Sequence, residues 1–165
     1  MFRAGVIVAS DKGSVGERKD KSGALILHHL KELGYEIVDY ALIADEKELI
    51  KENLIRMADE LKLDLIMTTG GTGFSKRDVT PEATLEVIDK EAPGIAEAIR
   101  YHSLSITPRA MLSRGVSGIR KDSLIINMPG SPKAVVEIME YIMDSVAHGL
   151  EIMTGKAFDC AEGKQ

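Results

Sequence analysis

The sequence has no tryptophan and few other aromatic residues, which argues against nucleic-acid binding. Aromatic side chains make up 4% of the 165 residues, so an aromatic platform for stacked bases is not expected. The formal net charge is −5, and no Lys/Arg-rich run supplies the basic patch that a duplex-binding protein normally carries. We therefore expect no nucleic-acid partner, although backbone amides and a metal ion can still bind a small anion locally.

Cysteine is also scarce, and long apolar runs are missing. The one cysteine, Cys160, cannot form an intrachain disulfide, which fits a reducing compartment. The first apolar run, residues 6–9, is too short for the core of a signal peptide or for a membrane span. These features predict a cytoplasmic protein that has no membrane partner.

What the sequence does contain is the composition of an ordinary globular protein. It is 44% hydrophobic and 28% charged, which favours a buried core and a soluble surface. No internal repeat or linker divides the chain. We expect one domain over residues 1–153, followed by a polar carboxyl-terminal tail over residues 154–165.

Short apolar runs alternate with segments of helical spacing. Expected strands cover residues 5–9, 35–42, 63–68 and 123–128, and expected helices cover residues 20–33, 46–61, 81–88, 92–105 and 132–153. Pro132 suits the first turn of the last helix, and Ser131 suits its N-cap. The alternation predicts an α/β fold, a three-layer α/β/α sandwich with a mostly parallel central sheet.

Four loops of unusual composition each follow an expected strand. They cover residues 10–17, 44–46, 69–80 and 128–132. In doubly wound sheets, ligands bind beyond the carboxyl ends of the strands, where the strand order reverses. We therefore expect these loops at one edge of the sheet, where residues far apart in sequence can share a crevice.

The loop after the third strand carries the most informative pattern, Thr-Gly-Gly-Thr-Gly at residues 69–73. Glycine accepts positive φ angles and lets the backbone approach a ligand closely. Successive amides in such a turn can form an anion-binding concavity, to which the hydroxyls of Thr68, Thr69 and Thr72 would add donors. The spacing matches neither the Walker A pattern nor the dinucleotide fingerprint. An anion cradle and a plain glycine-rich turn both remain open.

Charged side chains beside this loop each have two interpretations. Asp78 suits a Mg²⁺ ligand, or it supports the cap of the helix that starts near Thr80. Arg77 suits paired hydrogen bonds to phosphate, or it is a solvated surface charge, which is the favoured interpretation of Lys76. Asp45, with Glu48, matches a capping box, which the residues alone favour over a ligand role.

Two further loops could complete the crevice. Ser10 and Asp11 follow the first strand and would line it, unless they belong to an ordinary mobile loop. Pro129, Gly130 and Ser131 open the last helix, whose N-terminus offers free amides and partial positive charge to a phosphate. A tight turn with a helix cap is the simpler interpretation of that segment.

Three segments together resemble the MogA/MoaB family of molybdenum cofactor biosynthesis proteins, and the likeness is closer to MogA. They are residues 68–73, 77–83 and 127–132, which occur in the family's order and at its spacing, and residues 93–98 and 110–114 also match. The likeness runs from the first strand to about Met153. A related domain occurs in gephyrin.

The resemblance implies an adenylyltransferase that uses Mg²⁺ and ATP. The terminal phosphate of molybdopterin would attack the α-phosphate of ATP, and pyrophosphate would leave. Two family carboxylates map onto Asp45 and Asp78 as catalytic residues and Mg²⁺ ligands, which reverses the capping preference for Asp45. The family assembles as trimers, or as hexamers in the MoaB branch, so a homotrimer is expected, with a molybdenum-inserting protein as a partner. The expected substrate-binding residues are Ser10, Asp11, Thr69, Gly70, Gly71, Thr72, Gly73, Arg77, Ser113, Pro129, Gly130 and Ser131.

Two alternatives remain within this resemblance. A CinA-type domain would act on pyridine nucleotides or ADP-ribose, but such chains usually carry a further domain, for which 165 residues leave no room. A scaffold module would bind molybdopterin without consuming ATP. Such a module has no need of Asp45 and Asp78 together, and some MoaB-type relatives look inactive because the acidic position in the third loop is altered. The intact Asp78 therefore favours an enzyme.

Overall fold

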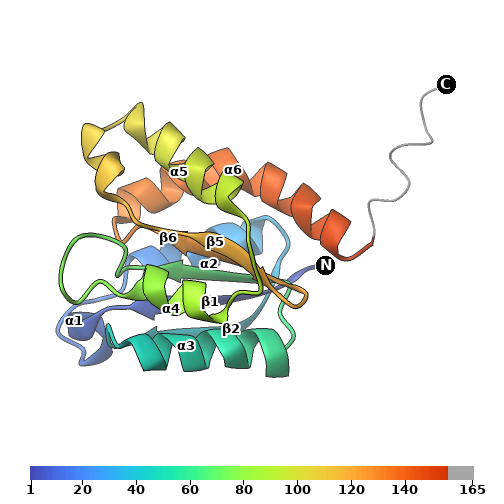
Figure 1. Cartoon of the computed structure of the whole chain (residues 1–165), viewed down its shortest axis with the longest axis horizontal. Coiled ribbons are helices and arrows are strands. Elements are labelled where there is room, and N and C mark those ends of the chain that lie inside the picture. The colour runs from blue at the N-terminus through green and yellow to red at the C-terminus, as the bar shows by residue number, and fades with distance from the viewer. Residues whose placement is uncertain (156–165) are drawn as a thin grey trace.

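The computed structural model describes residues 1–155, so Cys160 and all but the first two residues of the expected tail lie outside it. One six-stranded sheet forms its centre, with the strand order β2-β1-β3-β6-β5-β4 (Figure 1). The strands are β1 (Arg3–Ala9), β2 (Glu36–Ile43), β3 (Leu65–Thr69), β4 (Lys90–Glu91), β5 (Ser117–Arg120) and β6 (Ser123–Met128). The helices are α1 (Asp11–Ser14), α2 (Ser22–Glu32), α3 (Lys47–Ile55), η1 (Arg56–Glu60), α4 (Thr80–Val87), α5 (Pro93–Leu104), η2 (Pro108–Leu112) and α6 (Pro132–Met153).

Helices cover both faces of the sheet, which confirms the three-layer α/β/α sandwich. One core joins Val6 and Val8 of β1 to α2, α5 and α6, and the other joins Ile7 of the same strand to α3 and α4. Side chains of a strand alternate between the two faces, so β1 must be apolar at nearly every position. Figure 1 shows α5 and α6 on one side of the sheet and α3 and α4 on the other.

Strands β2, β1, β3 and β6 are parallel, and their carboxyl ends lie level with one another. Ala9 pairs with Ile43, Val8 pairs with Thr69, and Thr69 pairs with Met128. The sheet departs from parallel only at one edge, where β5 runs antiparallel to β6 and to β4. From β1 the chain steps outward to β2 and then crosses to β3 on the other side, so the strand order reverses between β1 and β3. The four predicted loops therefore begin side by side at this reversal.

Several boundaries differ from the sequence prediction. The single helix expected over residues 46–61 is found over residues 47–60, but it is divided into two types of helix. It begins at Lys47, and its last turn is the π-helical η1, where Leu61 N–H donates to the Arg56 carbonyl. Strands β4 and β5 were not predicted, nor were the short α1 and η2. Within residues 1–155, no helix combines the length and the apolar character needed to span a membrane.

Candidate active site

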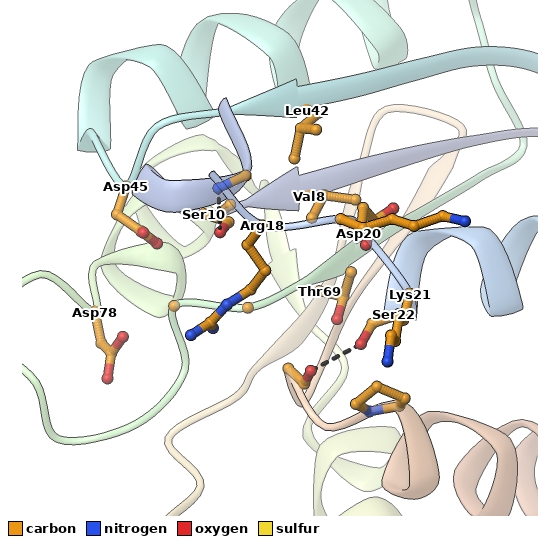
Figure 2. Close-up of a pocket in the computed structure, with 17 residues that line it drawn as sticks. Val8, Ser10, Arg18, Asp20, Lys21, Ser22, Leu42, Asp45, Thr69 and Asp78 are labelled. Carbon is orange, nitrogen blue, oxygen red and sulfur yellow. Dashed lines mark hydrogen bonds between the residues drawn. The ribbon is translucent and has the colours of Figure 1, made fainter. Parts of the chain in front are cut away.

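A cleft of about 480 Å³ opens where the strand order reverses. Its floor is the end of β1 and the glycine loop after β3, and its walls come from the loops after β1, β2 and β6 (Figure 2). Of the predicted site residues, those that line it are Ser10, Asp45, Thr69, Gly70, Gly71, Asp78 and Gly130. The rule that parallel strands bring their following loops together thus places the cleft correctly.

The glycine loop fits between the end of β1 and two carboxylates because it has no side chains. Gly70 and Gly71 have φ angles of +90° and +67°, which L-residues rarely adopt. A Cβ on Gly70 would collide with the Ala9 carbonyl oxygen, and one on Gly71 would lie 3.1 Å from Asp45 Oδ1. A Cβ on Gly73 would lie 2.9 Å from Asp78 Oδ2. The glycines therefore let the loop approach β1 and both carboxylates closely.

Two of the three threonine hydroxyls at this loop, those of Thr68 and Thr69, form hydrogen bonds inside the protein. Thr69 Oγ1 donates to the Pro129 carbonyl at 2.7 Å, which ties the glycine loop to the loop after β6. Thr68 is fully buried, and its Oγ1 accepts from Asn127 Nδ2 at 3.0 Å. Thr72 is also buried. The expectation that Thr68 would supply a donor to a ligand is therefore wrong, because its hydroxyl lies within the core.

Asp45 is held by a tertiary contact and does not cap a helix. Its Oδ2 accepts from the backbone N–H of Asp11 at 2.9 Å, and its own N–H donates to Asp11 Oδ1 at 3.0 Å. The N-cap of α3 is Glu46, which makes no side-chain cap bond. The capping-box interpretation is therefore wrong. Burial raises the pKa of the Asp45 carboxyl; the N–H bond from Asp11 lowers it, while the nearby negative charges of Asp11 and Asp78 raise it further.

Arg77 joins the acidic loops to one another. Its Nε and Nη2 donate to the two carboxylate oxygens of Asp11, each at 2.9 Å, and Nη2 also donates to Glu46 Oε1 at 2.7 Å. This paired contact holds the pKa of Asp11 below its ordinary value. The guanidinium is thus engaged with two carboxylates, and Arg77 is not among the residues that line the cleft.

Asp78 lies on the third loop, which Arg114 holds in place. Asp78 Oδ2 accepts from Ser75 N–H at 2.9 Å, and α4 begins without any side-chain cap, so Asp78 does not support that helix. Arg114 donates to the carbonyls of Gly73 at 2.7 Å and Asp78 at 2.8 Å, and it forms an ion pair with Glu82. The hydrogen bonds from the Arg114 guanidinium to these two backbone carbonyls thus hold the segment that carries Asp78.

Asp45 and Asp78 offer carboxylate oxygens, which are the type of ligand that Mg²⁺ prefers. Within residues 1–155, no three His, Cys, Asp or Glu side chains come together as ligands for a metal ion. Mg²⁺ in phosphoryl-transfer sites commonly takes one or two carboxylates and fills its other positions with phosphate oxygens and water. The charge of Asp78 raises the pKa of the half-buried Asp45 carboxyl, and both side chains line the cleft, which fits that requirement.

The sequence and the fold match known proteins over almost the whole chain. The model of a family described as a probable molybdopterin binding domain matches residues 5–148. The chain belongs to this family. It is 44% identical to a molybdopterin adenylyltransferase of Helicobacter pylori strain J99 over 92% of this chain and 87% of that protein. It is 41% identical to the molybdopterin adenylyltransferase of Escherichia coli K12 over 90% of this chain and 80% of that one.

A solved structure of the same family has the same fold. The molybdopterin biosynthesis enzyme MoaB from Thermus thermophilus superimposes with a TM-score of 0.88 and is 47% identical, over 94% of this chain and 98% of that chain. The expected fold and family are both confirmed.

Some expected substrate-binding residues of this molybdopterin-binding domain lie outside the cleft lining. Ser131 caps α6, its Oγ accepting from Ala134 N–H, as the sequence predicted. Ser113 follows η2 and bonds the Gly115 N–H. Asp11 and Arg77 support Asp45 from outside the lining. The remaining residues of this group are Thr72, Gly73 and Pro129.

Sequence reasoning missed one wall of the cleft. Arg18, Lys19, Asp20, Lys21 and Ser22 line it, directly before and at the start of α2. Ser22 Oγ donates to the Gly130 carbonyl at 2.8 Å and so joins this wall to the loop after β6 (Figure 2). Three basic residues within four positions were the available signal. They match no motif, and only the fold brings them to the cleft.

Proposed function

We propose that this protein is a molybdopterin adenylyltransferase that acts in the cleft at the carboxyl edge of its sheet. The terminal phosphate of molybdopterin attacks the α-phosphorus of ATP, the bond from that phosphorus to the β-phosphate oxygen breaks, and pyrophosphate leaves. The products are adenylylated molybdopterin and pyrophosphate. The names of the Helicobacter pylori and Escherichia coli relatives support the reaction.

One observation carries the proposal for this chain. Asp45 and Asp78 approach the glycine loop from two different segments, at positions where a glycine Cβ would touch each carboxylate. Two polyphosphates repel each other, so catalysis must position them and offset their charge. A Mg²⁺ ion bound by Asp45 and Asp78 would supply the Lewis acid that polarises the α-phosphorus.

The other residues of the cleft bind and orient. The backbone of Gly70 and Gly71 offers close approach to an anionic group, because no side chain covers it. Gly130 and the N-terminus of α6 hold another part of the ligands, where amide groups and partial positive charge favour a phosphate. Asp11 and Arg77 keep the Asp45 carboxylate in place through the hydrogen bonds described above.

The wider setting belongs to the same proposal. It comprises ATP as co-substrate, Mg²⁺ as metal, a homotrimeric assembly, a cytoplasmic location and a molybdenum-inserting protein that receives the product. It also comprises a domain that spans residues 1–153. The second candidate function is a molybdopterin-binding module that consumes no ATP, and the pair Asp45 and Asp78 is the observation against it.

The deciding experiment mixes the purified full-length chain with molybdopterin, ATP and Mg²⁺. We expect mass spectrometry to find adenylylated molybdopterin, with one pyrophosphate released for each adenylyl group transferred. Omission of Mg²⁺ should stop both the formation of adenylylated molybdopterin and the release of pyrophosphate. Binding of molybdopterin without ATP consumption would reject the enzyme in favour of the binding module.

A further inference from the structure

The wall that leads into α2 places positive charge along one side of the cleft. Arg18, Lys19 and Lys21 all line it, within four consecutive positions. In Figure 2, Lys21 and Ser22 lie on the side opposite Asp45 and Asp78, and the Arg18 side chain lies between them in this view. The lining thus brings basic side chains into the same cleft as the acidic pair.

The charges on this wall are left without carboxylate partners. Among residues 1–155, no ion pair or side-chain hydrogen bond engages Arg18 or Lys21. The acidic residue between them, Asp20, accepts from Tyr40 Oη at 2.7 Å and from Gly23 N–H at 2.9 Å, and within residues 1–155 it forms no ion pair with either cation. By contrast, the guanidinium of Arg77 is paired with Asp11 and Glu46, and that of Arg114 with Glu82.

The backbone that carries these cations is fixed. Arg18 N–H donates to the Lys12 carbonyl at 3.2 Å, which folds the segment back onto α1. Asp20 bonds to β2 through Tyr40, and Ser22 bonds to the loop after β6 through Gly130. Side chains that leave a held backbone lose less freedom on binding than those of a mobile loop, so they can hold an anion at a defined place.

We infer that Arg18 and Lys21 form a phosphate-binding site that faces the acidic pair across the cleft. The ligand is a phosphate group of one of the two substrates, held from the opposite side by the metal-binding carboxylates. A guanidinium suits this task because it presents paired donors to phosphate oxygens and stays charged at any working pH. The inference rests on the proposed adenylyl transfer only for the identity of the molecule that carries the phosphate. The anion site itself does not depend on turnover.

The direct test measures binding of inorganic pyrophosphate with Mg²⁺ by calorimetry. Arg18→Gln should weaken it about tenfold or more, because a hydrogen-bonded charge contact contributes roughly that much, and Arg18→Gln with Lys21→Gln should weaken it further. Arg18→Lys should retain part of the affinity. Arg109→Gln is the matched control, since Arg109 is exposed, lies in η2 and does not line the cleft. Higher salt should reduce binding more in the wild type than in the double variant.

Kinetics then separate the two possible sources of the phosphate. A rise in KM for ATP alone in Arg18→Gln assigns the site to the triphosphate, and a rise for molybdopterin alone assigns it to the pterin phosphate. Pyrophosphate affinity equal to wild type in both Arg18→Gln and the double variant would overturn the inference, as would absent binding in the wild type. Loss of pyrophosphate binding in the variants, with no adenylylated product from the wild type, would reject the proposed function and leave the anion site standing.

Discussion

Asp11 and Asp45 each donate a backbone N–H to the other's carboxylate, at 2.9 and 3.0 Å. They follow β1 and β2 and are 34 positions apart in the chain. Arg77, from the loop after β3, then binds both oxygens of Asp11. Three loops that begin at neighbouring strands are therefore tied to one another, and the orientation of the Asp45 carboxylate depends on all three.

The acidic pair gives the first prediction. Asp45→Asn and Asp78→Asn should each lower kcat by roughly 100-fold or more, because each removes a charge that holds the metal against the reacting phosphates. Circular dichroism should show unchanged secondary structure. Asp122→Asn is the matched control, since Asp122 is exposed in the turn between β5 and β6. Wild-type turnover in either site variant would remove that residue from the metal site.

Arg77 and Asp11 give a prediction about positioning. Arg77→Gln should lower kcat about tenfold or more and change both KM values little, because its guanidinium supports Asp11 without lining the cleft. Asp11→Ala removes the same support, so the double variant should be little worse than Arg77→Gln alone.

The contrary result has a clear meaning. A large rise in KM for ATP, with kcat preserved, would show that Arg77 contacts the phosphates directly. Additive losses in the double variant would show that Arg77 and Asp11 act separately. The first outcome would return Arg77 to the substrate-binding set that the sequence predicted.

Removal of the Asp45 charge is also expected to raise the stability of the fold. Its pKa is raised in the fold, chiefly by burial, so the folded state holds its proton more tightly than the unfolded chain does. The contribution of Asp45 to stability therefore falls as pH rises from the unfolded value of 3.8 through the folded pKa. Above that window the ionised carboxylate destabilises the fold. Asp45→Asn, which can still accept from Asp11 N–H, should raise Tm by about 1–3 °C at pH 7.

The measurement is differential scanning calorimetry at pH 7 and at pH 4, without added metal. The gain in Tm should shrink at the lower pH, where a larger share of the wild-type carboxyl is protonated. Added Mg²⁺ should raise Tm in the wild type and less in the variant. A lower Tm for Asp45→Asn at pH 7 would show that the ionised carboxylate stabilises the loops.

Two glycines give a matched pair of substitutions. Gly71→Ala forces a φ of +67° on a residue with a side chain and drives a Cβ against Thr80 Oγ1, so it should cost about 1–3 kcal/mol of unfolding free energy and lower turnover. Gly149→Ala lies inside α6 with nothing within 4 Å of the added Cβ, so it should stabilise by roughly 0.5–1 kcal/mol. Urea unfolding and turnover assays compare them. Normal activity in Gly71→Ala would show that the loop tolerates a side chain.

Local patterns predicted those parts of the fold that local interactions determine. The last helix, Pro132–Met153, matches its prediction end to end, because its apolar stripe, its proline and its Ser131 cap all lie within the segment. Strand β5 could not be recognised in the same way. Its sequence, Ser-Gly-Ile-Arg, has no apolar run, and it is held by pairing with β6 and by the contact of Arg120 with Asp59, 61 positions away.

The candidate site also has parts that the sequence predicts and parts that only the fold determines. The loops were predictable, because the carboxyl ends of parallel strands must meet at one edge. The hydrogen-bond partner of Asp45 was not predictable from the sequence. The same residues around Asp45 are compatible with a capping box and with a contact to Asp11, and only the fold decides between the two. Arg18 was missed for a related reason: it belongs to no motif, and its place in the cleft depends on the path of residues 14–22.

The two sides of the cleft differ in how they are built. On the acidic side, each group depends on loops from other strands, so a change at one position disturbs several others. On the basic side, Arg18 and Lys21 project from one short segment whose anchors, Asp20 and Ser22, are separate residues. Substitutions at positions 18 and 21 can therefore be made while the anchors stay in place. This segment is therefore where phosphate affinity can be changed by substitution, with the metal-binding side left untouched.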